Sequence, residues 1–265
     1  MSNNPYKSEK CEILKITKMT DIEWTFRIAT DKEINHGQFC HLSIPKVGEA
    51  PISVSGTGEG WIEFTIRSVG KLTSKIFNLV VGDYFYIRGP YGNGFNLEDL
   101  KDKHVVIAGG GSGVAPVKTL IDYLFTNDSF ASEVDLMFGF KTPNDILFKD
   151  KLDAWKAKFK TIITVDNACG VTDGVCEGLI TKYVKDIKLS EFSKMKVIIV
   201  GPPMMMKFTA LEFMKHGVPK ENIIVSFERN MSCGLGKCGH CKIDEKYVCL
   251  EGPIFNYDVA EKLID

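Results

Sequence analysis

The first hundred residues alternate between short apolar segments and breaks made of Gly, Pro and Asn. The apolar segments are rich in β-branched and aromatic residues, which favours strands over helices. We predict strands at residues 22–29 (IEWTFRIA), 38–44 (QFCHLSI), 61–67 (WIEFTIR) and 84–88 (YFYIR). A short helix is predicted over residues 73–80, because this segment starts with a Thr–Ser pair suited to capping. Strands at this spacing indicate an antiparallel barrel.

The pattern changes after residue 100, where short buried-strand segments alternate with longer helix-like segments. The predicted strands cover residues 104–108, 135–140, 161–165, 197–200 and 223–227. Strands that alternate with helices predict βαβ units and a parallel sheet, which binds ligands at the carboxyl ends of its strands.

Residues 229–265 form a Cys- and Gly-rich loop followed by a short helical tail. The predicted fold class is therefore multidomain α+β. An antiparallel Greek-key β-barrel (1–100) precedes an α/β parallel-sheet nucleotide-binding domain (101–228) and a small C-terminal region (229–265).

Charge and hydropathy exclude several classes of partner. The formal net charge of −1 argues against a nucleic-acid or anionic-membrane surface. The longest apolar stretches, such as 105–108 and 197–200, are far too short to span a bilayer. Because residues 1–10 are polar and resemble no signal peptide, we expect a cytoplasmic protein.

The eight cysteines are distributed unevenly, with four of them inside residues 233–249. Cys11, Cys40, Cys169 and Cys176 are scattered along the rest of the chain. This asymmetry indicates one metal site and four incidental cysteines in a reducing compartment.

The crowded cysteines are Cys233, Cys238, Cys241 and Cys249, in the spacing C-x4-C-x2-C followed by a fourth cysteine. This is the plant-type [2Fe–2S] arrangement. The glycines of the loop allow it to curl and leave backbone N–H groups free to point at sulfur.

Structural zinc is the alternative metal, but zinc sites usually show two separated pairs of ligands and only one such pair is present. His240 lies inside the loop, and because four cysteines already complete the site we expect it to face solvent or to lie behind the ligands.

A glycine-rich turn, VVIAGGGSGVAP at residues 105–116, runs from a predicted strand into a predicted helix. Glycines there would let the backbone approach a pyrophosphate, and the helix N-terminus supplies partial positive charge. The candidate binding residues are Gly110, Gly111, Ser112, Gly113, Val114 and Pro116. The motif is not a strict G-x-G-x-x-G, so a plain strand–helix turn is the alternative.

A second glycine turn follows the fourth strand of this region. Gly201, Pro202 and Met204 are suited to admitting a flat ring at the carboxyl edge of the sheet. The alternative is that residues 204–206 only pack a core.

These motifs, in this order, resemble the ferredoxin–NADP reductase superfamily, in which an FAD-binding barrel precedes a nicotinamide-binding domain. Residues 109–116 match its nicotinamide-nucleotide loop and residues 50–53 its flavin motif, usually Arg-x-Tyr-Ser. Residues 70–74 match the flavin pyrophosphate turn, and residues 89–95 match a third barrel signature.

The resemblance implies that Pro51, Ile52, Ser53 and Val54 contact FAD, with Ser53 near the reactive flavin nitrogen. Two departures concern this motif, because Ala50 replaces the phosphate-binding arginine and Ile52 replaces the stacking aromatic residue. The flavin phosphate would then depend on the turn at Gly70, on Thr73 and Ser74, and on a cation supplied by Arg67 or Lys71.

Within this superfamily, chains of this length that end in a [2Fe–2S] loop are electron-transfer subunits. They serve dihydroorotate dehydrogenase, sulfhydrogenases and anaerobic sulfite reductase. Residues 48–55, 201–204, 236–241 and 251–257 are most similar to the flavin- and cluster-binding subunit of anaerobic sulfite reductase. That resemblance implies a catalytic sirohaem subunit and a second iron–sulfur subunit as partners. The other two enzymes are the alternatives.

The predicted function is an NADH-dependent oxidoreductase in which electrons pass from NADH to FAD, to the cluster and to a partner. A flavin is required because nicotinamide delivers two electrons and the cluster accepts one. Glu228 is a candidate for lining the nicotinamide site, and a surface carboxylate paired with Arg229 is its alternative role. Asp166 follows the third strand of the region and no dense Arg cluster is present, which favours NADH over NADPH. A redox sensor without turnover is the competing function.

Overall fold

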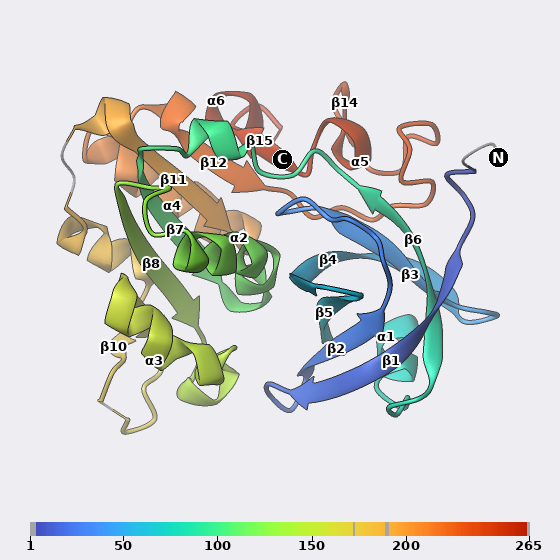
Figure 1. Ribbon diagram of the computed structural model, residues 1–265. Helices are drawn as coiled ribbons and strands as arrows, with labels where there is room; N and C mark the ends of the chain where they lie inside the picture. Colours follow the sequence, from blue (N-terminus) through green and yellow to red (C-terminus); the bar gives the residue numbers. More distant parts are fainter. Residues whose placement is uncertain (1–3, 172, 189–190, 264–265) are drawn as a thin grey trace. The chain divides into compact units, whose positions relative to one another are not determined.

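The computed structural model describes residues 4–171, 173–188 and 191–263. These residues form two compact units. One contains the described part of Met1–Phe95 together with Glu228–Pro253, and the other contains Asn96–Phe227 and the described part of Ile254–Asp265 (Figure 1). The cysteine-rich segment is thus part of the same unit as the first strands of the chain.

The first unit is a closed six-stranded barrel with the strand order β1-β2-β5-β4-β3-β6. All neighbouring strands are antiparallel. The strands are β1 (Glu9–Lys18), β2 (Glu23–Ala29), β3 (Phe39–Ile44), β4 (Gly48–Gly58), β5 (Trp61–Arg67) and β6 (Tyr84–Tyr91). The antiparallel barrel predicted from the sequence is confirmed.

Alternating side chains build the barrel core. In β1, Cys11 and Ile13 are buried while Glu12 and Leu14 beside them are exposed, which is the two-residue period of a half-buried strand. Apolar side chains from all six strands meet in one cluster, which helix α1 (Lys71–Ile76) covers with Leu72 and Ile76. Burial of this apolar surface is the main force that closes the barrel.

Helix α1 begins two residues before the predicted start at Thr73. The Thr73 hydroxyl accepts hydrogen bonds from the N–H groups of Val69 and Gly70, both at 3.0 Å, and donates to the Gly70 carbonyl at 3.1 Å. Thr73 therefore closes the first turn from inside the helix, and Gly70 takes the capping position.

The second unit is a seven-stranded sheet with the order β10-β9-β8-β7-β11-β12-β15. The strands are β7 (His104–Gly110), β8 (Glu133–Phe140), β9 (Lys160–Val165), β10 (Cys176–Glu177), β11 (Met195–Val200), β12 (Ile223–Ser226) and β15 (Ile254–Asn256). All pairs are parallel except β12 with β15, so the predicted parallel-sheet domain is confirmed with one antiparallel strand added at its edge.

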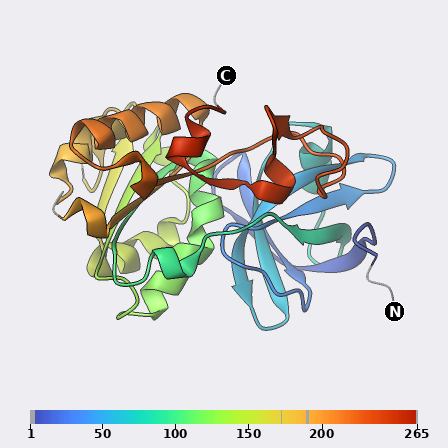
Figure 2. The ribbon, with the colours of Figure 1, turned by 90° about the horizontal axis from the view of Figure 1, so that it is seen from above.

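Helices cover both faces of this sheet. Figure 2 shows α4 in orange on one face and α2 and α3 in green on the other. Their bounds are α2 (Val114–Thr126), α3 (Lys149–Lys158) and α4 (Pro203–Lys215). Because both faces are covered, every residue of β7 is buried and the strand has no alternation, as is typical of central parallel strands.

The cysteine-rich segment contains little regular structure. A small hairpin of β13 (Lys242–Ile243) and β14 (Lys246–Tyr247) precedes α5 (Val248–Glu251). After β15 the described chain ends with α6 (Tyr257–Ala260). No helix in the described ranges is long and apolar enough to cross a membrane.

Candidate functional site

The four cysteines of the predicted cluster lie on the loop that follows residue 230 and on the short helix α5. Cys241 and Cys249 are buried, Cys233 is half-buried and Cys238 is exposed. None of the four forms a disulfide with another described cysteine. Cys249 lies in the first turn of α5, and the hairpin of β13 and β14 separates it from Cys241, so a short chain segment returns the fourth cysteine to the other three.

Backbone N–H groups of the loop point at the sulfur atoms. The N–H groups of Leu235 and Lys237 donate to Cys233 Sγ at 3.3 and 3.4 Å. Gly236 N–H donates to Cys249 Sγ at 3.1 Å, and Cys249 N–H donates to Cys241 Sγ at 3.4 Å. Gly236 adopts a φ of +65°, a left-handed conformation that favours glycine and that turns its N–H toward Cys249.

The thiols affect one another's ionisation. Desolvation raises the pKa of Cys233, but hydrogen bonds from the N–H groups of the loop outweigh it and lower the pKa to about 6. Burial, followed by the proximity of Cys241 and Cys233, raises the pKa of Cys249 to about 12. Thiols crowded in this way ionise together only when a metal compensates their charge, so these residues fit a metal-bound group.

One buried polar atom beside the loop supports the same fit. His41 Nε2 is fully buried and has no hydrogen-bond partner among the described residues. A Cβ atom added at Gly234 would lie 3.2 Å from this nitrogen. Buried polar atoms are usually paired, so this nitrogen leaves one hydrogen-bonding position open beside the cysteine loop. His240 is exposed, in keeping with the solvent-facing position expected for it.

The predicted flavin residues lie on β4 and around α1, and these two elements pack against each other. Pro51, Ile52 and Ser53 are half-buried on β4, and Val54 is buried. Ser53 lies opposite Phe39 of β3 in the register. The structure thus brings the two predicted flavin segments together in one unit.

The groups proposed to bind the flavin phosphate differ in their solvent exposure and in the hydrogen bonds that they already make. The Thr73 hydroxyl is occupied inside the first turn of α1, whereas Ser74 is exposed and shares a 3.3 Å hydrogen bond with Ser68. Arg67 Nε lies 3.5 Å from Glu23 Oε1 and has no hydrogen bond among the described residues. Gly70 and Lys71 are exposed at the same turn. Ser74, Arg67 and Lys71 fit a phosphate better than Thr73 does.

The nucleotide loop connects β7 to α2. Gly110 ends the strand, Gly111–Gly113 form a 3₁₀ turn, and α2 begins at Val114, with Val114 and Pro116 buried in its first turn. A Cβ atom at Gly113 would lie 2.5 Å from the Val200 carbonyl oxygen. This closeness leaves no room for a side chain, so Gly113 is required by packing against β11.

The second glycine turn lies beside the first. Strand β11 pairs with β7, with Val200 opposite Gly109, so both strands end at the same edge of the sheet. A Cβ atom at Gly110 would lie 3.2 Å from Met205 Sδ and 3.3 Å from Pro202. Met206 is buried and packs the core, as the alternative proposed, but Met204 is 59% exposed at the edge.

Two further predicted residues can be placed within their own units. Asp166 follows β9 at the same carboxyl edge; its N–H donates to the Phe140 carbonyl at 3.0 Å and its side chain is exposed. Glu228 is exposed by surface area, yet partial desolvation raises its pKa above the usual value. Because water reaches Glu228, this shift alone assigns it no catalytic role.

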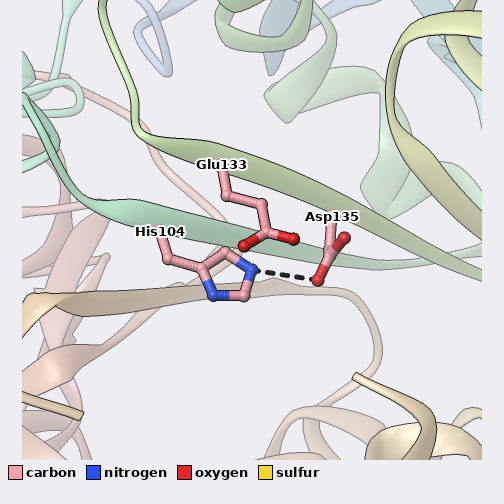
Figure 3. Close-up of side chains that lie close together, drawn as sticks. All are labelled: His104, Glu133 and Asp135. Carbon is pink, nitrogen blue, oxygen red and sulfur yellow. Dashed lines mark hydrogen bonds and ion pairs between the residues drawn. The ribbon is translucent and has the colours of Figure 1, made fainter. Parts of the chain in front are cut away.

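A second group of metal-binding side chains lies at the opposite edge of the sheet. Ligand atoms of His104, Glu133 and Asp135 lie within 4.8 Å of one another at the amino ends of β7 and β8 (Figure 3). His104 Nε2 lies 2.9 Å from Asp135 Oδ2, and Asp135 is only 1% exposed. We interpret this group as a buried hydrogen bond between adjacent strands, with the exposed carboxylate of Glu133 beside it.

Three residues of the barrel that the sequence did not indicate contact the cysteine loop or each other. Arg88 is the only buried arginine in the described ranges, and it hydrogen-bonds to the carbonyl oxygens of Ser232 and Cys233. Glu49 and His41 lie against its guanidinium group. The only available signal was that Arg88 directly precedes the third barrel signature.

Comparison with known proteins identifies both binding regions. Residues 106–210 match the oxidoreductase NAD-binding domain, and residues 228–260 match the iron–sulfur cluster binding domain of dihydroorotate dehydrogenase B. The chain is 31% identical to sulfhydrogenase 2 subunit gamma of Pyrococcus furiosus, with 96% of each chain covered. The chain belongs to this family of electron-transfer subunits.

The family extends beyond the sulfhydrogenases. A probable dihydroorotate dehydrogenase B (NAD(+)) electron transfer subunit of Thermoplasma volcanium is 32% identical over 86% of this chain and 81% of its own length. A chain of the NADH-dependent reduced ferredoxin–NADP oxidoreductase, a structure described for flavin-based electron bifurcation, superposes with a TM-score of 0.78. That chain is 25% identical, and the match covers 96% of this chain and 92% of its own.

Membership of the family confirms the coarser predictions. The chain is an oxidoreductase electron-transfer subunit of the ferredoxin–NADP reductase type, with NADH, FAD and an iron–sulfur cluster as cofactors. These relatives support the sulfhydrogenase and dihydroorotate dehydrogenase alternatives better than the sulfite reductase prediction. Sulfite reductase as the specific enzyme is not supported by them.

Proposed function

We propose that the chain oxidises NADH and passes the electrons through FAD and a [2Fe–2S] cluster to a separate catalytic subunit. The observation that carries this proposal is the cysteine loop, in which backbone N–H groups point at the sulfurs of Cys233, Cys241 and Cys249. When bound, FAD supplies the chemistry that joins a two-electron donor to a one-electron acceptor. The four cysteines including Cys238 would hold the cluster.

The three ligands would be divided along the sequence. We assign FAD to residues 1–100, NADH to 101–228 and the cluster to 229–265. On the barrel, Pro51–Val54 would border the flavin ring, and Ser53 would hydrogen-bond near its reactive nitrogen. Near the N-terminal turn of α1, Arg67 and Lys71 would neutralise the phosphate and Ser74 would hydrogen-bond to it, because Lys71 and Ser74 are exposed and Arg67 Nε has no hydrogen bond among the described residues.

The NADH site would lie at the carboxyl edge of the parallel sheet. Gly110–Gly113 would approach the pyrophosphate with backbone N–H groups, and the N-terminus of α2 would add partial positive charge. The turn at Gly201–Met204 would admit the nicotinamide ring beside it. The exposed carboxylate of Asp166 at the same edge would repel a 2′-phosphate, which supports NADH over NADPH.

An anaerobic visible spectrum tests this proposal. The purified protein is expected to show flavin and [2Fe–2S] bands, and both should bleach when NADH is added and respond far less to NADPH. Iron and acid-labile sulfide should each be present at about two per flavin. A protein that contains zinc and no flavin, or a flavin that NADH leaves oxidised, would contradict the proposal. The second result would favour a redox sensor.

The partner is proposed by class. The relatives favour a catalytic subunit of the sulfhydrogenase or dihydroorotate dehydrogenase kind. A sirohaem subunit with a second iron–sulfur subunit, as in anaerobic sulfite reductase, rests on the sequence motifs alone. Copurification of the tagged chain from its source separates these partners. A hydrogenase or a flavin-containing dihydroorotate-oxidising subunit supports the first class, and a sirohaem spectrum in the complex supports the second.

A further inference from the structure

Arg88 makes an unusual set of contacts for a side chain of the barrel. It lies on β6 and is only 5% exposed. Its guanidinium donates to the carbonyl oxygens of Ser232 and Cys233, both at 2.5 Å. These two carbonyls belong to the peptide groups before and after Cys233, the first cysteine of the loop, so one side chain holds the loop where the ligands begin.

The barrel in turn holds Arg88 in a fixed orientation. Glu49 of β4 accepts two hydrogen bonds from it, at 2.6 Å from Nε and 2.7 Å from Nη2. The Tyr91 hydroxyl accepts a third at 3.1 Å. Paired contacts between a guanidinium and a carboxylate fix its plane, so the remaining N–H directions are set before they meet the loop.

The loop lies close against the same part of the barrel. A Cβ atom at Gly234 would lie 3.1 Å from the Tyr91 ring and 3.2 Å from His41 Nε2. His41 lies opposite Arg88 in the register of β3 and β6, and its Nδ1 is 3.2 Å from Arg88 Nη2. The same Nδ1 lies 3.5 Å from Glu49 Oε2, while His41 Nε2 faces Gly234.

We propose that Arg88 is a positioning residue that fixes the first cluster ligand, Cys233, to the flavin-binding barrel. The inference rests on the proposed function, since it assumes that the cysteines hold the cluster. Its consequence is that the geometry at Cys233 depends on a side chain 145 residues away in the sequence. A lysine at position 88 keeps the positive charge but cannot satisfy Glu49 and two carbonyls at once.

The barrel contains a matched control. Arg27 on β2 donates from Nε and Nη2 to Glu63 Oε1 at 3.0 and 2.8 Å, and its guanidinium stacks on Trp61. It is therefore another arginine–glutamate pair between barrel strands, here the neighbouring strands β2 and β5, and these contacts lie within the barrel rather than on the cysteine loop. Because the Arg27 side chain is 32% exposed and that of Arg88 is 6% exposed, Arg27→Lys should weaken the barrel less, and it should leave the loop as it is.

The test compares Arg88→Lys and Arg27→Lys in the full chain. For Arg88→Lys we expect iron release to a chelator to become about tenfold faster, since this is the effect of losing one charge-assisted hydrogen bond. We also expect a broadened EPR spectrum of the reduced cluster, while NADH bleaches the flavin as in the wild type. For Arg27→Lys all three readouts should stay within about twofold of the wild type.

Two results would overturn the inference. One is an Arg88→Lys protein whose iron release and EPR spectrum match the wild type. The other is an Arg27→Lys protein that changes them as much as Arg88→Lys does. If Arg88→Lys does not fold, Glu49→Gln replaces it, because Glu49 is partly exposed and the amide keeps one acceptor for Arg88. Glu49→Gln should then accelerate iron release, and an unchanged rate would likewise overturn the inference.

A measurement without the cluster separates this inference from the proposed function. Hydrogen exchange of the amides in residues 233–238 is compared between wild type and Arg88→Lys after iron is removed. Faster exchange in the variant supports the role of Arg88, and equal exchange contradicts it. If the wild type is purified without iron or flavin, the proposed function is wrong, and this comparison still decides whether Arg88 fixes the loop.

Discussion

The chain contains two glycine-rich loops that use glycine in different ways. In the cysteine loop, glycine supplies conformation: Gly236 has a φ of +65° and its N–H reaches a cysteine sulfur at 3.1 Å. In the nucleotide loop, glycine supplies space: a Cβ atom at Gly113 would lie 2.5 Å from a backbone carbonyl. The first loop is fixed by polar contacts to sulfur and to Arg88, and the second by close packing against β11.

Substitutions in the two loops should therefore have different effects on ligand binding and on folding. The cysteine loop depends on hydrogen bonds and on a group that its thiols bind, so its variants should lose the ligand before they lose the fold. The nucleotide loop is part of a buried sheet, so its tightest glycine cannot change without displacing a strand. Substitutions in the two loops and a change of pH can test this contrast.

Removing one thiol should have the largest effect. Cys249→Ser is expected to abolish iron binding, because the buried fourth ligand is lost and a serine hydroxyl is a poor ligand for iron in such a cluster. Iron and sulfide analysis with the visible spectrum measures this, and the flavin should stay bound. Cys176→Ser, outside the loop, is the control and should keep full iron content. A Cys249→Ser protein with normal iron would show that the loop does not hold the cluster.

Gly113→Ala tests the packing of the nucleotide loop. The added methyl would press on the Val200 carbonyl, and we expect the free energy of unfolding to fall by about 3 kcal/mol, with NADH binding weakened in parallel. Gly111→Ala is the control, because a Cβ there meets open space. Its φ of +54° is unfavourable for alanine and should lower the free energy of unfolding by about 1 kcal/mol. Thermal unfolding and NADH titration measure both variants. Equal losses of stability in the two variants would show that backbone conformation, and not the space for a side chain, requires glycine in this loop.

Lowering the pH should destabilise the part of the barrel that lies beside the cysteine loop. Burial, then the Arg88 charge, lowers the pKa of His41 from 6.5 to about 4, although Glu49, which lies near the same ring nitrogen, raises it. The folded state therefore favours neutral His41, and the unfolded state binds the extra proton as pH falls below 6.5. Between about pH 7 and pH 5 we therefore expect the free energy of unfolding to fall by about 2 kcal/mol.

The His41 prediction is checked by denaturant unfolding of the protein at several pH values. Burial raises the pKa of Glu49, but its hydrogen bonds and ion pair with Arg88 outweigh this and hold it below the usual value. Glu49 therefore stays ionised over this window. His41→Gln should remove most of the slope between about pH 7 and pH 5. A slope that persists in the variant would assign the acid sensitivity to another group.

Gly236→Ala should have the smallest effect on stability and a clear effect on the cluster. The φ of +65° costs about 1 kcal/mol for alanine, and the methyl also meets Leu250, an exposed and flexible side chain 2.7 Å away that can move. Gly239→Ala has a similar φ and open space, so it controls for conformation alone. Faster iron release from Gly236→Ala than from Gly239→Ala would show that the N–H to Cys249 is displaced. Equal rates would contradict a role for this hydrogen bond.

The sequence predicted the strands whose own residues favour them. The four barrel strands and five parallel strands that were predicted are present, because β-branched and aromatic residues dominate them. Strands β1 and β4 were missed. In β1 only Cys11 and Ile13 of ten residues are buried, and β4 contains Gly, Pro and Ser. Both segments become strands because they pair with neighbouring strands, and local propensity does not predict such pairing.

The candidate site was predictable where its residues are close in sequence. The cysteine spacing and the glycine turns are local, so the sequence indicated a cluster and a nucleotide loop. Arg88, Glu49 and His41 were not predictable, because they meet only through the register of β3, β4 and β6, and a shift between Phe39 and His41 sets that register. An ion pair of this kind depends on strand pairing, which a single sequence does not reveal.

The path of the C-terminal chain has a practical consequence for protein engineering. The chain passes from one unit to the other at residues 95–96, 227–228 and 253–254, and after the cysteine loop it returns to add β15 to the sheet beside β12. Cutting the protein at residue 228 would therefore remove an edge strand of the nucleotide-binding sheet as well as the cysteines. The iron–sulfur segment therefore cannot be removed as a separate module. A graft or deletion that preserves the sheet must keep Ile254–Asn256 connected to the rest of the sheet.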